Sequence, residues 1–240
     1  MFENRTYRAQ HQKKGLVSFE VTVKETNLNI QAHTDLTDKA IKLVLTCRNH
    51  IETYITFHPE FATSFTPLQN PGPAPGIIRD MIDASTLANV GPMAAVAGAV
   101  AEYTGKSLLA FTSEILVENG GDIFIKSDTD TIFSIYAKNS PFSMTTGIQV
   151  KKRDTPYGMC TSSGTLGHSK SFGKADAATV FSDSCPLADA TATKLGNMIN
   201  TAADINAAID AGKAIPGING IVIIKGEKIG LWGDLKLVKI

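Results

Sequence analysis

The period of the hydrophobic side chains changes repeatedly along this chain, and the order of those changes restricts the folds open to it. Residues 16–23 alternate between apolar and polar side chains, which predicts a strand, and a turn leads to a partner strand ending near Ala32. Helical spacing follows over residues 37–58 and again over residues 77–103. From Glu114 the period of two returns. Strands, helices and strands, closed by further helices and strands, predict two lobes in which sheets pack against helices.

Proline and glycine divide the helical part of the chain. Residues 67–76 contain four prolines and two glycines, so we expect a stiff loop that is neither helix nor central strand. The helix predicted from Pro92 to Tyr103 is apolar almost all round and rich in alanine and glycine, which is typical of a buried helix in close contact with its neighbours. Later strands are predicted at 115–118, 122–126, 131–137, 147–151 and 177–181, helices at 186–199 and 204–211, and a hairpin at 221–224 and 229–232.

Composition excludes several classes of protein. Lysine plus arginine and aspartate plus glutamate both number 23, so no net field would draw the chain to nucleic acid or acidic membranes. The basic run at 151–153 is interpreted as a solvated loop. Three cysteines without a Cys-x-x-Cys pair favour a reducing compartment over a disulfide framework or a zinc site. No apolar run resembles a signal peptide or reaches the ~20 residues of a membrane span, so we expect a soluble, cytoplasmic protein that binds neither nucleic acid nor membrane.

Three segments carry residues suited to chemistry, and the first is Glu118-Asn119-Gly120-Gly121-Asp122. A Gly-Gly pair between two strands is often no more than a hairpin turn. The functional alternative is that the paired glycines let a ligand approach the backbone, with Asn119 and Asp122 on either side of it. The sequence leaves both interpretations open.

The second segment runs from Met159 to Lys174 and concentrates hydroxyls, glycines, lysines and one histidine, His168. Hydroxyls and free backbone N–H groups suit a phosphate or another anion. The segment is not a P-loop, since five residues separate Gly167 from Gly173, and it contains no Gly-x-Ser-x-Gly of a nucleophile elbow. The alternative is a flexible polar loop without a ligand, in which the histidine is structural or exposed to solvent.

The third segment, Asp183 to Thr193, contains Pro186, which marks the start of a helix. Asp189 and Thr193 are four residues apart, so their side-chain oxygens lie on one helical face, and the small residues between them leave room above it. Hard oxygen ligands of this kind suit Mg²⁺ or Ca²⁺. The alternative is an aspartate that interacts only with the dipole of its own helix, a contribution of about 0.3–1 kcal/mol.

Together, Asn119-Gly-Gly-Asp122, Thr161-Ser-Ser-Gly164, His168 and Ala188-Asp-Ala-Thr-Ala-Thr193 resemble the motif order of the ApbE superfamily, whose best-known members are FAD:protein FMN transferases. With Gly91-Pro-Met-Ala-Ala-Val-Ala-Gly98 added, the chain resembles more closely an uncharacterised prokaryotic branch of that superfamily, over nearly its whole length. The resemblance implies one ApbE-like domain over residues 1–240. It also implies an α+β fold of two pseudo-symmetric, T-fold-like α/β lobes, with mainly antiparallel sheets packed with helices and a ligand cleft between the lobes.

The resemblance also implies ligands and residue roles. Mg²⁺ would be held by Asp189 and Thr193, and FAD or another flavin nucleotide would be the ligand or substrate. The residues expected to bind it are Asn119, Gly120, Gly121, Thr161, Ser162, Ser163, Gly164 and Thr165, with His168 and Asp122 as catalytic residues. Two departures distinguish the chain from the transferases: Ser169-Lys170 follows the histidine where they have Asp-Pro, and Gly91-Pro92-Met93 replaces their central Lys-Gly segment. We therefore do not expect transfer of FMN onto an exported protein.

These observations lead to three hypotheses. The first is a Mg²⁺-dependent enzyme that acts on a flavin or other nucleotide phosphate as its small-molecule partner. The second is a flavin- or nucleotide-binding module that has lost transferase activity, as the missing Asp-Pro suggests. The third is a hydrolase that uses Ser162 or Ser163 with His168, but the sequence places no carboxylate to orient the histidine.

Overall fold

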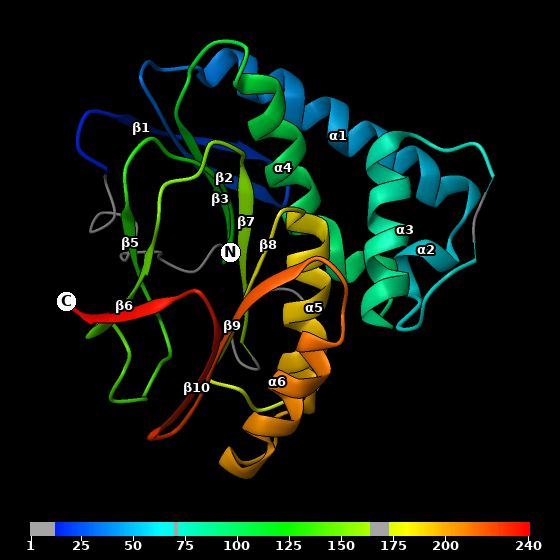
Figure 1. Cartoon of the computed structure of the whole chain (residues 1–240). Helices are drawn as coiled ribbons and strands as arrows, with labels where there is room; N and C mark the ends of the chain where they lie inside the picture. Colours follow the sequence, from blue (N-terminus) through cyan, green and yellow to red (C-terminus); the bar gives the residue numbers. More distant parts are fainter. Residues whose placement is uncertain (1–12, 70–71, 164–172) are drawn as a thin grey trace.

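An antiparallel sheet of eight strands forms the centre of the molecule (Figure 1). The computed structural model describes residues 13–69, 72–163 and 173–240. Across the sheet the strands follow the order β1 (Val17–Val23), β2 (Thr26–Ala32), β3 (Ile115–Asn119), β4 (Asp122–Lys126), β7 (Tyr157–Ser162), β8 (Ala177–Ser182), β9 (Ile218–Lys225) and β10 (Lys228–Gly233). A second sheet of three strands has the order β11 (Lys236–Lys239), β6 (Thr146–Val150) and β5 (Thr131–Ser134).

Helices cover one face of the large sheet, and the three-stranded sheet lies on the other side (Figure 1). The helices are α1 (Thr37–Phe57), α2 (Glu60–Thr63), α3 (Gly76–Ala88), α4 (Val96–Leu108), α5 (Cys185–Met198) and α6 (Ile205–Lys213). A 3₁₀ turn over Pro92–Ala95 leads into α4. Of these, α4 and α5 contact strands at the middle of the sheet, whereas α3 packs on α5 from outside.

Two hydrophobic cores follow from the alternation of side chains along the same strands. Val117 and Phe124 belong to the core beneath the helices, and their neighbours Leu116 and Ile125 belong to the core between the two sheets. Because both faces of its middle strands are covered, β8 is buried at every residue. The predicted α+β class, with antiparallel sheets packed with helices, is confirmed.

The connectivity of the large sheet repeats. β1 and β2 are followed by helices and then by β3 and β4, and β7 and β8 are followed by α5, α6 and then by β9 and β10. Each unit therefore has two strands, helices and two strands, with the four strands adjacent in the sheet. The two units meet where β4 pairs with β7.

Most of the predicted elements are present, but the segment after Tyr157 differs from the expectation. Residues 158–162, for which no strand is predicted, form most of β7, which pairs with β4 on one side and β8 on the other. Met159 and Cys160 are buried in this strand. Gly158 has weak strand propensity and the segment lacks regular apolar alternation, so tertiary pairing on both edges, which is invisible in the local sequence, decides its conformation.

Within the described ranges, no helix on its own has the length and apolar character needed to cross a membrane. One pair of helices, Gly76–Ala88 with Pro92–Leu108, reaches those values only when taken together, and its two members are bent at 106° to each other.

Candidate functional site

Two buried aspartates from sequence-distant segments lie together where the two units meet. Asp122 is the first residue of β4 and stands opposite Cys160 of β7. Asp189 belongs to α5, which packs on β7. The two residues are only 8% and 9% exposed, and the charge of Asp122 acts on the carboxyl of Asp189. The first and third chemistry-bearing segments therefore converge at one place.

The glycines of the first segment have structural explanations. Asn119 pairs with Asp122 across a two-residue turn, and Gly120 has a φ of 82°, which favours glycine. A Cβ atom on Gly121 would lie 2.9 Å from the carbonyl oxygen of Thr161, so this glycine permits the close approach of β7. The hairpin interpretation accounts for both glycines, and their role toward a ligand stays a prediction.

The hairpin is fastened to α4 through Asn119. Its Nδ2 donates a hydrogen bond of 3.1 Å to the carbonyl oxygen of Ala97, in the first turn of α4. Because Asp122 pairs with Asn119, this bond also fixes the position of the aspartate relative to the helix. Asn119 thus orients the hairpin that carries Asp122.

Asp189 interacts with the start of a helix other than its own. It lies beyond the first turn of α5, and its Oδ2 accepts a hydrogen bond of 2.9 Å from the backbone N–H of Gly98, near the start of α4. The expected interaction with the dipole of its own helix is therefore replaced by one with α4. A Cβ atom on Gly98 would lie 2.5 Å from the carbonyl oxygen of Cys185, so glycine is required for the helices to approach this closely.

The aspartate pair is electrostatically unfavourable when both carboxyl groups are ionised. Burial raises the pKa of the Asp189 carboxyl, Asp122 raises it further, and the N–H groups of Gly98 and Ala97 lower it only in part, so the pKa stays well above its usual value. A divalent cation held by both carboxylates would offset the burial and the repulsion together. Carboxylate and hydroxyl oxygens are the hard ligands that Mg²⁺ prefers, so the donor set fits this ion.

Further oxygens would have to complete such a site. Over residues 13–69, 72–163 and 173–240, no group of three or more His, Cys, Asp or Glu side chains is arranged to hold a metal ion. Thr193 stands one turn beyond Asp189 on α5 and is half-buried. Hydroxyl and backbone oxygens, water or the oxygens of a phosphate ligand would therefore supply the remaining positions.

Two cysteines lie beside the aspartates. The Sγ of Cys160 donates a hydrogen bond of 3.5 Å to the carbonyl oxygen of Cys185, and both residues are fully buried free thiols. Burial raises the pKa of both thiols, and the nearby Asp122 contributes in each case. Since the thiolate is the reactive form, these cysteines are inert residues of the core beside the site.

The second segment brings a hydroxyl side chain beside α5, further along that helix than Asp189. Thr161, Ser162 and Ser163 are half-buried at the end of β7, and the Oγ of Ser162 would lie 3.3 Å from a Cβ atom on Gly196 of α5. Thr193 falls between Asp189 and Gly196 along α5. Ser162 and Thr193 therefore border one stretch of this helix, whereas the side chain of Thr161 lies on the other face of the sheet, with its Oγ1 2.9 Å from the Oγ1 of Thr179 on β8.

Three predicted site residues, Gly164, Thr165 and His168, lie outside the described residues. Ser162 approaches Gly196, and a Cβ atom on Gly173 would lie 1.9 Å from the carbonyl oxygen of the same glycine. Ser162 and Gly173 therefore both lie beside the turn of α5 that follows Thr193.

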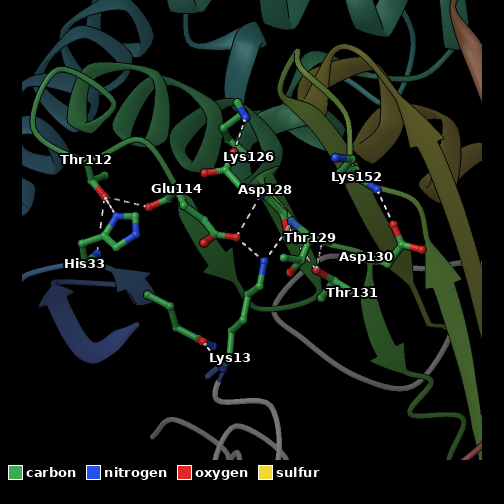
Figure 2. Close-up of polar contacts among 12 residues, drawn as sticks. Lys13, His33, Thr112, Glu114, Lys126, Asp128, Thr129, Asp130, Thr131 and Lys152 are labelled. Atoms are coloured by element: carbon green, nitrogen blue, oxygen red, sulfur yellow. Dashed lines mark hydrogen bonds and ion pairs between the residues drawn. The ribbon is translucent and has the colours of Figure 1, made fainter. Parts of the chain in front are cut away.

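Sequence reasoning missed a second polar cluster, which Figure 2 shows. Glu114 forms an ion pair with Lys13 and accepts a hydrogen bond of 3.0 Å from the backbone N–H of Asp128. Burial raises the pKa of Glu114, but these donors bring it below its usual value. The cluster lies at the opposite end of the β3–β4 hairpin from Asp122, and its carboxylate charge is compensated, so it anchors the chain near Lys13.

The fold is that of the ApbE flavin transferases. The flavin transferase ApbE from Vibrio cholerae matches with a TM-score of 0.57 at 12% identity, over 90% of this chain and 96% of that chain. The apo form of the Pseudomonas stutzeri flavinyl transferase ApbE matches with a TM-score of 0.59 at 11% identity, over 90% and 94%. At these identities the likeness shows a shared fold, and the protein is ApbE-like in architecture.

Sequence relatives define the family more closely. The model of the family described as AbpE bacteria matches residues 8–231, so the chain belongs to this family. A UPF0280 protein of Methanococcus aeolicus is 38% identical over 226 residues, covering 92% of this chain and 91% of the relative. One from Methanocaldococcus jannaschii is 41% identical over 226 residues, covering 91% and 92%. The resemblance to a prokaryotic, ApbE-like branch is confirmed.

Proposed function

We propose that this protein is a Mg²⁺-dependent enzyme that acts on a flavin or another nucleotide phosphate. The observation that carries the proposal is the buried pair of Asp122 and Asp189, brought together from two sequence-distant segments beside the hydroxyls of β7. Two like charges held in a buried place are costly without a cation. The shared fold with proteins named flavin transferases supports a flavin nucleotide as the ligand class.

Each part of the site has a proposed role. Asp189, Thr193 and Asp122 would hold Mg²⁺, which when bound neutralises phosphate charge and acts as a Lewis acid. Ser162 and Ser163 would donate hydrogen bonds to phosphate oxygens at the end of β7, Gly164 and Thr165 would extend that set, and Thr161, whose hydroxyl pairs with that of Thr179, would hold the end of the strand in place.

Around the reacting phosphate, Asn119, Gly120 and Gly121 would place the hairpin against the ligand, His168 would handle protons, and Asp122 would act in catalysis through the cation that it helps to hold. Because the site draws on both units of the sheet, we also propose that residues 1–240 act as one domain.

Calorimetric titration with FAD, FMN and ADP, each with and without Mg²⁺, tests the proposal. At least one of these compounds should bind more tightly with the metal, and the gain should disappear in Asp189→Asn. A matched control is Asp210→Asn, which changes an exposed aspartate of α6 whose carboxylate pairs with Lys213. If Mg²⁺ improves the affinity of none of the three compounds, the proposal is wrong.

A non-catalytic binding module is the alternative, and one observation favours it: Ser169-Lys170 stands where the transferases have Asp-Pro. Turnover separates the two. Incubation of the protein with FAD and Mg²⁺, followed by chromatography of the nucleotides over hours, should release product if the protein is an enzyme. Bound flavin without any product would support the module. Labelling by a serine-reactive phosphonate would instead favour the hydrolase hypothesis based on Ser162 or Ser163.

A further inference from the structure

Glu102 of α4 is a buried carboxylate that reaches the start of a neighbouring helix. Its side chain is 4% exposed, and its Oε2 accepts a hydrogen bond of 2.6 Å from the backbone N–H of Cys185, the first residue of α5. Its Oε1 accepts a bond of 2.6 Å from the Nζ of Lys106, whose side chain is 56% exposed. The inner oxygen of Glu102 is therefore committed to α5.

Asp189 makes the reciprocal contact. It lies on α5 and accepts from the backbone N–H of Gly98 near the start of α4, at 2.9 Å. Gly98 and Glu102 are four residues apart, and so are Cys185 and Asp189. The two bonds thus stand one helical turn apart on both helices, which run antiparallel at this contact. Together they fix the position of α5 along α4, whereas a single bond would let one helix pivot against the other.

Stability of the start of α5 alone does not explain this arrangement. The hydroxyl of Ser184 already accepts a hydrogen bond of 3.4 Å from the N–H of Leu187, so the helix has a side-chain cap of its own. Burying the carboxylate of Glu102 carries a desolvation cost that the half-exposed Lys106 offsets only in part. The contact with Glu102 therefore acts mainly by setting the position of α5.

We infer that Glu102 is a positioning residue for the cation site. By holding Cys185 against α4, it sets Asp189, one turn further on, at the place where it meets Asp122. This inference rests on the proposed function, since it assumes that the two aspartates hold a cation. Residues that support metal ligands in this way commonly change metal affinity by about 10–100-fold when they are replaced.

Two conservative substitutions test the inference with Mn²⁺ as the probe, followed by electron paramagnetic resonance well below the melting temperature of each variant. Glu102→Gln keeps an acceptor within reach of the Cys185 N–H but removes the charge. Glu102→Asp keeps the charge but shortens the side chain by one methylene, which withdraws the acceptor. Positioning predicts that the Asp variant binds Mn²⁺ about 10–100-fold more weakly, whereas the Gln variant stays close to the unmodified protein.

The opposite pattern, with affinity lost in Glu102→Gln and kept in Glu102→Asp, would show that Glu102 acts through its charge and would overturn the inference. Unchanged affinity in both variants, even with lower melting temperatures, would also overturn it, because Glu102 would then be only structural. If Glu102→Asp does not fold, lost affinity in the folded Gln variant still refutes the inference, and Glu102→Ala then withdraws the acceptor in its place and should bind Mn²⁺ about 10–100-fold more weakly. Lys106→Met is the control, since it removes the outer partner and leaves the bond to Cys185.

The unmodified protein and Asp189→Asn separate this result from the proposed function. If the unmodified protein binds no Mn²⁺, or if Asp189→Asn binds it equally well, the proposed cation site itself fails. If Asp189→Asn loses Mn²⁺ while both Glu102 variants keep it, the cation site stands and only the role of Glu102 is refuted.

Discussion

Replacing Asp189 with asparagine separates a structural carboxylate from a cation ligand. The asparagine keeps the size of the side chain and one acceptor, so the 2.9 Å bond from Gly98 persists as a neutral bond. A bond to a charged group contributes about 1.5–3 kcal/mol and a neutral one about 0.5–1.5 kcal/mol, so the loss is about 1–2 kcal/mol. Removing one of two like charges from a buried place offsets part of that loss. Without metal, the variant should therefore fold with a similar melting temperature.

Mg²⁺ should distinguish the two proteins. At a concentration 100 times the dissociation constant, a ligand that binds only the folded state stabilises it by about 2.7 kcal/mol. For a chain of this size each kcal/mol raises the melting temperature by about 2–4 °C, so the unmodified protein should gain about 5–10 °C. Asp189→Asn should gain little, because one of the two carboxylate ligands is lost.

Differential scanning fluorimetry with Mg²⁺ and with EDTA measures both effects on one plate. Asp210→Asn on α6 serves as the control and should keep the full Mg²⁺ shift. An equal shift in Asp189→Asn and the unmodified protein would show that Asp189 only interacts with α4, and the metal assignment would then be refuted.

Three further predictions concern packing, charge and thiols. Gly98→Ala places a Cβ atom 2.5 Å from the carbonyl oxygen of Cys185, so it should cost about 1–3 kcal/mol in urea unfolding, and an unchanged midpoint would contradict the close helix contact. Lys13→Met leaves Glu114 buried without its cation and should cost about 3 kcal/mol at neutral pH. The pKa of Glu114 is lowered in the folded protein, so its stabilisation is present above the unfolded pKa and lost as pH falls through the folded pKa. Melting curves in acid should therefore converge for the two proteins, and a constant gap at every pH would count against the ion pair. Iodoacetamide should label Cys160 and Cys185 only after unfolding, as mass spectrometry can follow, and labelling of the native protein would show that the thiols are accessible.

Periodicity predicted most of this fold because the buried faces are regular. The helix over residues 77–88 shows its inner face in Ile77, Ile78, Met81 and Ile82, all of which are buried. The polar strand β7 was not predictable in the same way, since Gly158, Thr161 and Ser162 lack the apolar alternation on which the method depends. Its two paired neighbours, β4 and β8, determine it instead.

The segments that contain Asp122 and Asp189 could be singled out from the sequence by their residue types, but the sequence contains no signal for the contact between α4 and α5. In the sequence, Glu102 and Lys106 form an ordinary surface pair four residues apart on a helix. The bond from Glu102 to Cys185 spans 83 residues, and the ion pair between Lys13 and Glu114 spans 101. Contacts of this separation depend on the assembled sheet, and no local pattern encodes them.

The candidate site lies at the junction of β4 and β7, and this junction resembles an interface between two subunits. One unit supplies Asp122 and the other supplies Asp189, and the strands at the junction pair over a short register from Asp122–Cys160 to Ile125–Tyr157. A polypeptide cut between these strands would leave one carboxylate on each fragment, and neither fragment would hold the complete pair. Cation binding would then behave as an association reaction, with an affinity that depends on fragment concentration. Because the two halves belong to one chain, each is present at a fixed effective concentration relative to the other.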